Sequence, residues 1–340
     1  MRSIFFKTTL AALVTAGALL PAARAQDLFV VSDRPEKGAD TVNVFRAKTG
    51  ASAGVLASGQ GFTGLAFGPD GNLYVNREGG HTAVDPATGV ATRDYETGRG
   101  GRDLALGKDG NLYVSDFRGV RRVDRATGAA SLFASGGGLA NTAGLTFGPD
   151  GHLYVVNTGL GGSVLRFDGT SGAFLGKFVS FAGGDAYGLA FGPDGHLYVS
   201  MGSDSSVRRF DGTTGALLST FVASGSGGLA VANDLAFGAD GHLYVASFGS
   251  HSVLRYDGAT GAFLDTFASG GGMERPTWIA FGPAAAPGGG DNPPTTAVPE
   301  PGTFALLGAG VLPLAGAAVR RRRSTTLVGG ASTPSRRRQV

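Results

Sequence analysis

Cysteine is absent from the 340-residue sequence, and charged residues make up only 16% of it. Without cysteine there can be no disulfide scaffold, no thiolate metal site and no cysteine nucleophile. Glycine is instead abundant, at 60 residues, yet it follows no Gly-X-Y period, which excludes a collagen-like chain. The 42% of hydrophobic residues is enough to bury a core, so the composition predicts many short strands joined by tight turns.

Acidic residues are missing from both ends of the chain. Residues 1–25 hold three basic residues and residues 303–340 hold seven, so the segment 26–302 keeps 19 basic and all 26 acidic residues. The whole chain has a net charge of +3, whereas the segment 26–302 by itself has a net charge of −7. A segment with this charge repels phosphate backbones, which argues against a nucleic-acid partner.

The first 25 residues have the order of a secretory signal peptide. Two basic residues and the apolar stretch 8–20 precede Ala23 and Ala25, which form an A-x-A cleavage site before Gln26. We therefore expect export through the Sec translocon and a mature chain that begins at Gln26, outside the cytoplasm. The alternative is a buried N-terminal helix.

A linker and a short apolar span follow the body of the chain. Proline and glycine recur so often in 283–302 that no regular helix or strand is expected there. Residues 303–319 carry no charge, and their length is near the shortest that crosses a bilayer. Four arginines follow, so 303–323 is predicted to be a transient inner-membrane anchor with the arginines on the cytoplasmic side.

The end of the linker and this span together resemble the PEP-CTERM sorting signal of Gram-negative bacteria. The resemblance rests on three parts in order, which are the run Val298-Pro299-Glu300-Pro301, the apolar span, and the cluster Arg320, Arg321, Arg322 and Arg323. It implies recognition by an exosortase-like protease, cleavage near the Pro-Glu-Pro, and a place at the cell surface with exopolysaccharide or envelope proteins as partners. Residues 324–340, which such signals usually lack, are expected to be a disordered tail. An ordinary C-terminal anchor is the alternative.

The body, residues 26–282, is built from a repeat. The segment GLAFGPDGNLYV at 64–75 recurs in variants that begin at 103, 144, 188 and 234. Repeats of about 40–45 residues with four short strands each are typical of a β-propeller rather than of a helical solenoid. The stretch 27–58 supplies the second to fourth strands of one unit, and 276–281 supplies a first strand with nothing after it.

These two ends complete each other and determine the predicted fold. We expect an all-β, six-bladed β-propeller of four-stranded blades, closed by a blade that the N- and C-terminal ends of the body share. The units resemble NHL-repeat propellers, a broad group that also includes lactonase-like and lyase-like sheets. The resemblance implies the fold, but it implies no particular function.

The five histidines follow the repeat and are not expected to form a catalytic or metal site. His152, His196 and His242 occupy the position after a turn glycine, while His81 and His251 are expected just before the third strands of their units. The sequence also lacks the Walker A, HExxH and GxSxG motifs, so no catalytic residue is assigned.

One position of the first strand provides the candidate metal ligands. In the six units it reads Gly64, Asp103, Gly144, Gly188, Asp234 and Trp278. Asp103 and Asp234 are three blades apart in a ring of six, so we expect them to face each other across the axis, with the glycines leaving the channel open. Together with Glu274 from a nearby loop they could bind Ca²⁺ or another divalent cation, which prefers oxygen ligands. The other interpretation is that each aspartate caps backbone amides.

These patterns predict an exported protein of the cell surface or extracellular matrix whose propeller is a binding or scaffold module. The alternative function is a metal-dependent hydrolase or lyase of the lactonase-like propeller class, with its site at the axis. The two differ in what the axial mouth contains, because an enzyme of that class needs a bound divalent ion among clustered polar side chains.

Overall fold

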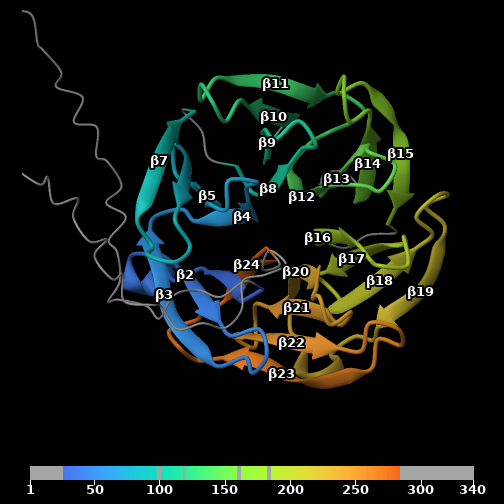
Figure 1. Cartoon of the computed structure of the whole chain (residues 1–340). Helices are drawn as coiled ribbons and strands as arrows, with labels where there is room; N and C mark the ends of the chain where they lie inside the picture. Colours follow the sequence, from blue (N-terminus) through green and yellow to red (C-terminus); the bar gives the residue numbers. More distant parts are fainter. Residues whose placement is uncertain (1–25, 98–100, 118, 159–161, 182–184, 284–340) are drawn as a thin grey trace, which may run out of the picture. The chain divides into compact units, whose positions relative to one another are not determined.

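The computed structural model describes residues 26–97, 101–117, 119–158, 162–181 and 185–283. The predicted signal peptide, the linker beyond residue 283, the apolar span and the tail lie outside these residues. Within them, 24 strands form six four-stranded antiparallel sheets (Figure 1). The described helical elements are two short 3-10 turns, η1 (Pro35–Lys37) and η2 (Ser226–Gly228), and no described helix is long and apolar enough to cross a membrane.

Each sheet is one blade, in which the strands follow one another from the innermost to the outermost. Blade 1 consists of β24 (Pro276–Phe281), β1 (Leu28–Ser32), β2 (Asp40–Phe45) and β3 (Ser52–Gly59), and blade 2 consists of β4 (Thr63–Phe67), β5 (Leu73–Arg77), β6 (Gly80–Val84) and β7 (Ala91–Glu96). Blade 3 consists of β8 (Leu104–Leu106), β9 (Leu112–Asp116), β10 (Gly119–Val123) and β11 (Ala130–Ser135), and blade 4 consists of β12 (Thr142–Phe147), β13 (Leu153–Asn157), β14 (Ser163–Phe167) and β15 (Phe174–Ser180). Blade 5 consists of β16 (Ala186–Phe191), β17 (Leu197–Met201), β18 (Ser206–Phe210) and β19 (Leu217–Val222), and blade 6 consists of β20 (Ala232–Phe237), β21 (Leu243–Ser247), β22 (Ser252–Tyr256) and β23 (Phe263–Ser269).

The six innermost strands close a ring. Each of β4, β8, β12, β16, β20 and β24 contacts the next one in this order, and β24 contacts β4 (Figure 1). Blade 1 is shared between the two ends of the body, because β24 pairs with β1 in an antiparallel register that sets Val30 opposite Ile279. The predicted fold class and its mode of closure are therefore confirmed.

The hairpin between the first two strands of a blade is specified by its own residues. In blade 4, Gly151 has a φ of +80°, which only glycine adopts without strain, and its N–H donates to the carbonyl of Gly148 at 2.9 Å. Asp150 accepts from the N–H of His152 at 3.0 Å and from the hydroxyl of Tyr154 at 2.8 Å. Each such turn thereby fixes the start of a second strand.

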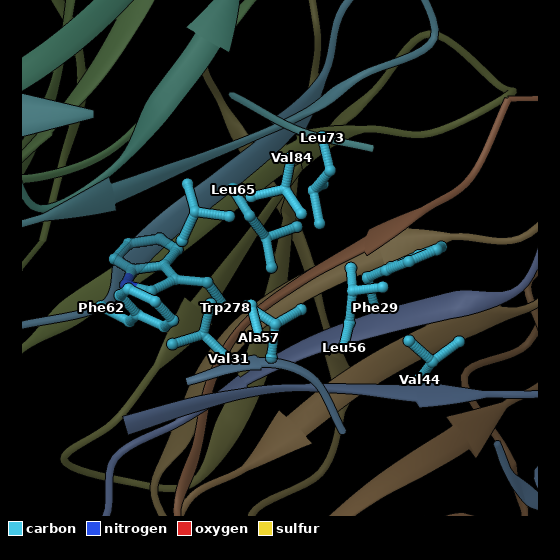
Figure 2. Packing of buried hydrophobic residues seen from close by; sticks show 12 residues of the cluster. Phe29, Val31, Val44, Leu56, Ala57, Phe62, Leu65, Leu73, Val84 and Trp278 are labelled. Atoms are coloured by element: carbon cyan, nitrogen blue, oxygen red, sulfur yellow. The ribbon is translucent and has the colours of Figure 1, made fainter. Parts of the chain in front are cut away.

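Aromatic rings fill the interfaces between blades. Tyr154 is fully buried, and its ring makes edge-on contacts with Phe178 of its own blade at 4.9 Å and with Phe191 of the next blade at 5.0 Å. Tyr113, Tyr198 and Tyr244 repeat this arrangement in blades 3, 5 and 6. Between blades 1 and 2, aromatic and aliphatic side chains pack together, and Trp278 belongs to the hydrophobic cluster there (Figure 2).

Candidate functional site

The innermost strands place both predicted aspartates among backbone amides. Asp103 directly precedes β8, and its two carboxylate oxygens accept from the N–H of Leu104 at 2.8 Å and from the N–H of Leu145 in the next blade at 3.0 Å. Asp234 in β20 accepts in the same way from Ile279 of the next blade at 3.0 Å. Each side chain is 9% exposed. Each carboxylate thus ties its own first strand to the first strand that follows around the ring.

The glycines at the equivalent position pack against neighbouring strands instead of leaving open space. A Cβ atom on Gly188 would lie 2.4 Å from Oδ1 of Asp234, and one on Gly64 would lie 2.5 Å from the Cα atom of Asp103. On Gly144, a Cβ atom would lie 2.6 Å from the carbonyl oxygen of Tyr187. The expectation of a glycine-widened channel is therefore wrong, because glycine is needed there for close approach of the strands.

Burial raises the pKa of both carboxyl groups. Desolvation is the main cause for Asp234, where it outweighs the amide hydrogen bonds from Ile279 and Leu235 and raises the pKa to about 7. The pKa of Asp103 lies well above its usual 3.8, because desolvation is joined by repulsion from the charge of Asp234. The two groups therefore titrate as a coupled pair, in which ionisation of Asp234 opposes that of Asp103.

Replacing Asp234 by asparagine is expected to remove a pH dependence of folding stability. The carboxyl ionises near pH 3.8 when unfolded and near pH 7 when folded, so the native state binds this proton more tightly. The stability that Asp234 contributes is then complete below pH 3.8 and is lost as the pH rises through 7, by on the order of 4 kcal/mol. Urea unfolding at several pH values should show the advantage of the wild type over Asp234→Asn shrinking as the pH rises.

A control for this experiment is Val90→Ser, which replaces an exposed uncharged residue and should leave the pH profile unchanged. A constant stability difference between wild type and Asp234→Asn across the range would contradict the assignment. Millimolar Ca²⁺ added to the same samples tests the predicted metal site, since a bound cation raises stability by mass action. A rise that vanishes in Asp234→Asn would support that site.

Glu274, the third predicted metal ligand, is engaged elsewhere. Its carboxylate is half-exposed and forms an ion pair with the ammonium group of Lys37 in η1. Across the described parts of the chain, no group of three or more His, Cys, Asp or Glu side chains is arranged to hold a metal ion. The structure brings Asp103 and Asp234 into mutual electrostatic contact, and the cation itself stays a prediction.

Four of the five histidines lie beside residues of their own turns and loops. His152, His196 and His242 lie with Nδ1 between 3.7 and 3.9 Å from turn aspartates of their own blades. His251 accepts the N–H of Arg275 at 3.0 Å through Nδ1. These contacts hold hairpins and loops together, as the repeat predicts.

His81 is different, since it lies within β6 rather than just before it. It is 1% exposed, its Nδ1 is 2.5 Å from Oδ1 of the buried Asn76, and its Nε2 is 3.4 Å from the hydroxyl of Thr97. Burial, together with the charges of Arg121 and Arg77, lowers the pKa of His81 to about 4 and keeps the ring neutral at pH 7.

The register of the strands shows what His81 replaces. The matching third-strand positions of the other blades are Val42, Val120, Val164, Val207 and Val253. The signal for a buried histidine was its substitution for this valine, but the equivalence of the positions is recognised only once the strands are paired. With partners on both ring nitrogens, His81 is a structural contact.

The predicted processing residues fall at the edge of the described chain or beyond it. Gln26 is the first described residue, and Ala23 and Ala25 precede it. The sorting residues Val298 to Pro301 and Arg320 to Arg323 also lie outside the described residues. Evidence about them comes from comparison with known proteins.

A family model described as the PEP-CTERM protein-sorting motif matches residues 297–323. No curated protein matches the chain. Among solved structures, the chain is similar to one in a nidogen/laminin complex, with 15% identity and a TM-score of 0.59 over 76% of this chain and 98% of that one. It is also similar to a protein of unknown function from Bacteroides caccae, with 13% identity and a TM-score of 0.58 over 76% and 99%. At these identities the likeness shows the fold alone.

Proposed function

We propose that this chain, an exported six-bladed β-propeller with a C-terminal PEP-CTERM sorting motif, acts at the cell surface as a binding module and not as an enzyme. The sorting motif indicates export and C-terminal processing. The binding role is supported by an apolar surface on the outermost strands of three adjacent blades. We call this surface the apolar outer wall and define it as Phe174 and Leu175 of β15, Leu217 and Leu218 of β19, and Phe263 and Leu264 of β23.

The apolar outer wall combines apolar residues with a bulge at the same place in each of these strands. Between Arg209 and Phe210 the register with β19 shifts, so two residues of the outer strand face one residue of its neighbour, and both Leu217 and Leu218 are exposed. Their exposed fractions are 59% and 46%. The same shift recurs opposite β15 and β23, and also opposite β3 and β7, where the residues at the bulge are small or polar.

The wall is confined to one side of the ring. The corresponding residues are Ser52 and Ala53 in blade 1 and Ala91 and Thr92 in blade 2, and β11 of blade 3, which lacks this bulge, begins with Ala130. Large apolar side chains gain nothing by facing water, and contiguous exposed groups of them mark interaction surfaces. Because three neighbouring blades carry an exposed apolar pair, and blades 2 and 3 carry only single exposed apolar residues such as Val90 and Leu132, the wall supports contact with another envelope component.

Replacing Leu217 and Leu218 by serine tests this role. Both side chains are exposed, so folding stability is expected to change by less than about 1 kcal/mol. In cell fractionation, the wild type should remain bound to the cell surface and the double variant should appear in the medium. Val90→Ser, which alters an exposed apolar residue of blade 2 outside the wall, is the matched control. Equal surface retention of the double variant would contradict the proposal.

The alternative function, a metal-dependent hydrolase or lyase with an axial site, makes a different demand. A cation would have to bind Asp103 and Asp234 in addition to the amides that these carboxylates already accept. The calcium titration described above decides between the two functions, because a binding module of the outer wall requires no axial cation.

A further inference from the structure

Four grooves between adjacent blades are covered by an arginine. The guanidinium group lies over an aromatic ring of the interface in each, as Arg125 over Tyr74 at 5.6 Å, Arg166 over Phe178 at 5.6 Å, Arg209 over Tyr198 at 5.8 Å, and Arg255 over Phe267 at 5.5 Å. These contacts lie at the grooves between blades 2 and 3, 4 and 5, 5 and 6, and 6 and 1. These four grooves therefore serve as the comparison for a groove in which no arginine lies over a ring.

The groove between blades 3 and 4 is open. Its arginine, Arg122, donates through Nε to Asp109 at 2.8 Å, and among the described residues no guanidinium lies over the ring of Phe133, Tyr113 or Phe147. A cavity of about 670 Å³ lies there instead, a volume within the range of small-molecule sites. The rings of Phe133 and Phe147 form part of its lining.

Two departures from the repeat meet at this groove. Lys108 stands where three other blades have a turn proline, Pro69, Pro149 and Pro193. In β11, Phe133 follows its turn glycine after five residues, whereas Phe178 in β15 follows after six, so β11 lacks the extra bulge residue. One change introduces a cation at the cavity and the other reshapes the strand that lines it.

Lys108 is available to a ligand. It is exposed, it has no ion-pair partner among the described residues, and its ammonium group extends toward Gly151 of blade 4, within 3.4 Å of where a Cβ atom on that glycine would lie. Arg122 and Asp109 neutralise each other. The residues that line the cavity therefore carry one uncompensated positive charge, at Lys108, which favours a ligand that places an anionic group there.

The rest of the lining indicates the kind of anion. The hydroxyl-bearing side chains of Ser131, Thr170 and Ser171 lie at the cavity together with Leu132 and the two phenylalanine rings. Hydroxyl groups suit a ligand that is itself rich in hydroxyls, while the rings suit a C–H face. A uronic acid, which is a sugar ring that bears a carboxylate, presents hydroxyl groups, a C–H face and a negative charge.

We propose that the groove between blades 3 and 4 binds a uronic-acid unit of an acidic polysaccharide, with its carboxylate on Lys108 and its ring face on Phe133. This inference rests on the proposed function as a surface binding module and names a ligand for it. Because half of the residues that line the cavity are exposed, a chain of sugars can enter it from the side of the propeller.

Calorimetric titration of the mature protein from the cell surface tests the inference. The probes are trigalacturonate, galacturonate monomer, and the uncharged maltotriose, all at the same ionic strength. We expect trigalacturonate to bind more tightly than the monomer, since an extended chain occupies more of the groove, and we expect no heat from maltotriose. Equal binding of charged and uncharged sugars, or no heat from trigalacturonate, would overturn the inference.

Lys108→Pro restores the residue of the neighbouring turns, and the N–H that proline lacks makes no described hydrogen bond at this position. It should weaken trigalacturonate binding about tenfold, the loss of one charge-assisted contact. The control is Lys177→Ala, which removes an exposed lysine from the outer strand of blade 4 and should bind as the wild type does. Unchanged binding by Lys108→Pro would place the sugar elsewhere. Surface retention that persists without saccharide binding would refute this inference alone and leave the proposed function intact.

Discussion

A chain that ends at residue 275 is expected to lose the cooperative unfolding transition of the propeller. This truncation removes β24, which pairs with β1 along its length and contacts both β20 and β4. It takes Trp278 and Ile279 out of two separate hydrophobic clusters and leaves Asp234 without one of its amide partners. Each large buried side chain contributes about 1.5–3 kcal/mol, so the loss rivals the 5–15 kcal/mol of a typical domain.

The matched control is a chain that ends at residue 283 and keeps the whole of β24. Thermal unfolding followed by circular dichroism compares the two truncated chains. We expect the longer one to unfold in a single transition and the shorter one to show a broad, low-temperature change or none. A shared melting temperature would mean that the ring does not depend on the blade that its two ends form.

Replacing Glu300 by alanine is expected to stop the protein from reaching the surface in its processed form. The sorting model covers residues 297–323, which include the Pro-Glu-Pro run, the uncharged span and the arginine cluster. Without cleavage near that run, we expect the span and its arginines to keep the chain in the inner membrane. Fractionation should find the variant there and the wild type at the surface.

Mass spectrometry of the C-terminus provides the second measurement for this prediction. Wild-type protein from the surface should lack Arg320 to Arg323, whereas membrane-bound Glu300→Ala should retain them. Glu36→Ala, at an exposed acidic residue of η1, is the control and should be processed normally. Surface protein that still carries the arginines would show that processing at this motif is not required.

The repeat alone predicted the fold, including its closure, because the signals involved are local. A turn such as Gly148 to Gly151 depends on the φ angles and hydrogen bonds of four consecutive residues, and these are written in their identities. The strand count at the two ends of the body then required that 276–281 join 27–58, and β24 pairs with β1 as expected. The sorting motif is likewise a contiguous pattern, and the family match confirms it.

The candidate site could not be predicted in the same way, because it depends on distances between blades. The positions of Asp103 and Asp234 in the repeat could be read from the sequence. The sequence did not show that each carboxylate would accept an amide N–H from the next blade, or that Asp234 would occupy the space beside Gly188. Equally, the histidine at position 81 was visible, but its burial against Asn76 required the register of β5 with β6.

By itself, the sequence determined the number of blades, their order, the turns within them and the address that directs the chain to the surface. Only the tertiary structure decided which polar groups form hydrogen bonds within the ring and which surfaces stay exposed. Lys108 is an ordinary turn residue until Arg122 is seen to bond Asp109 and leave the ring of Phe133 uncovered. The physical reason is that hydrogen bonds and ring contacts between blades join residues far apart in the chain, so a side chain's role depends on what the neighbouring blade places beside it.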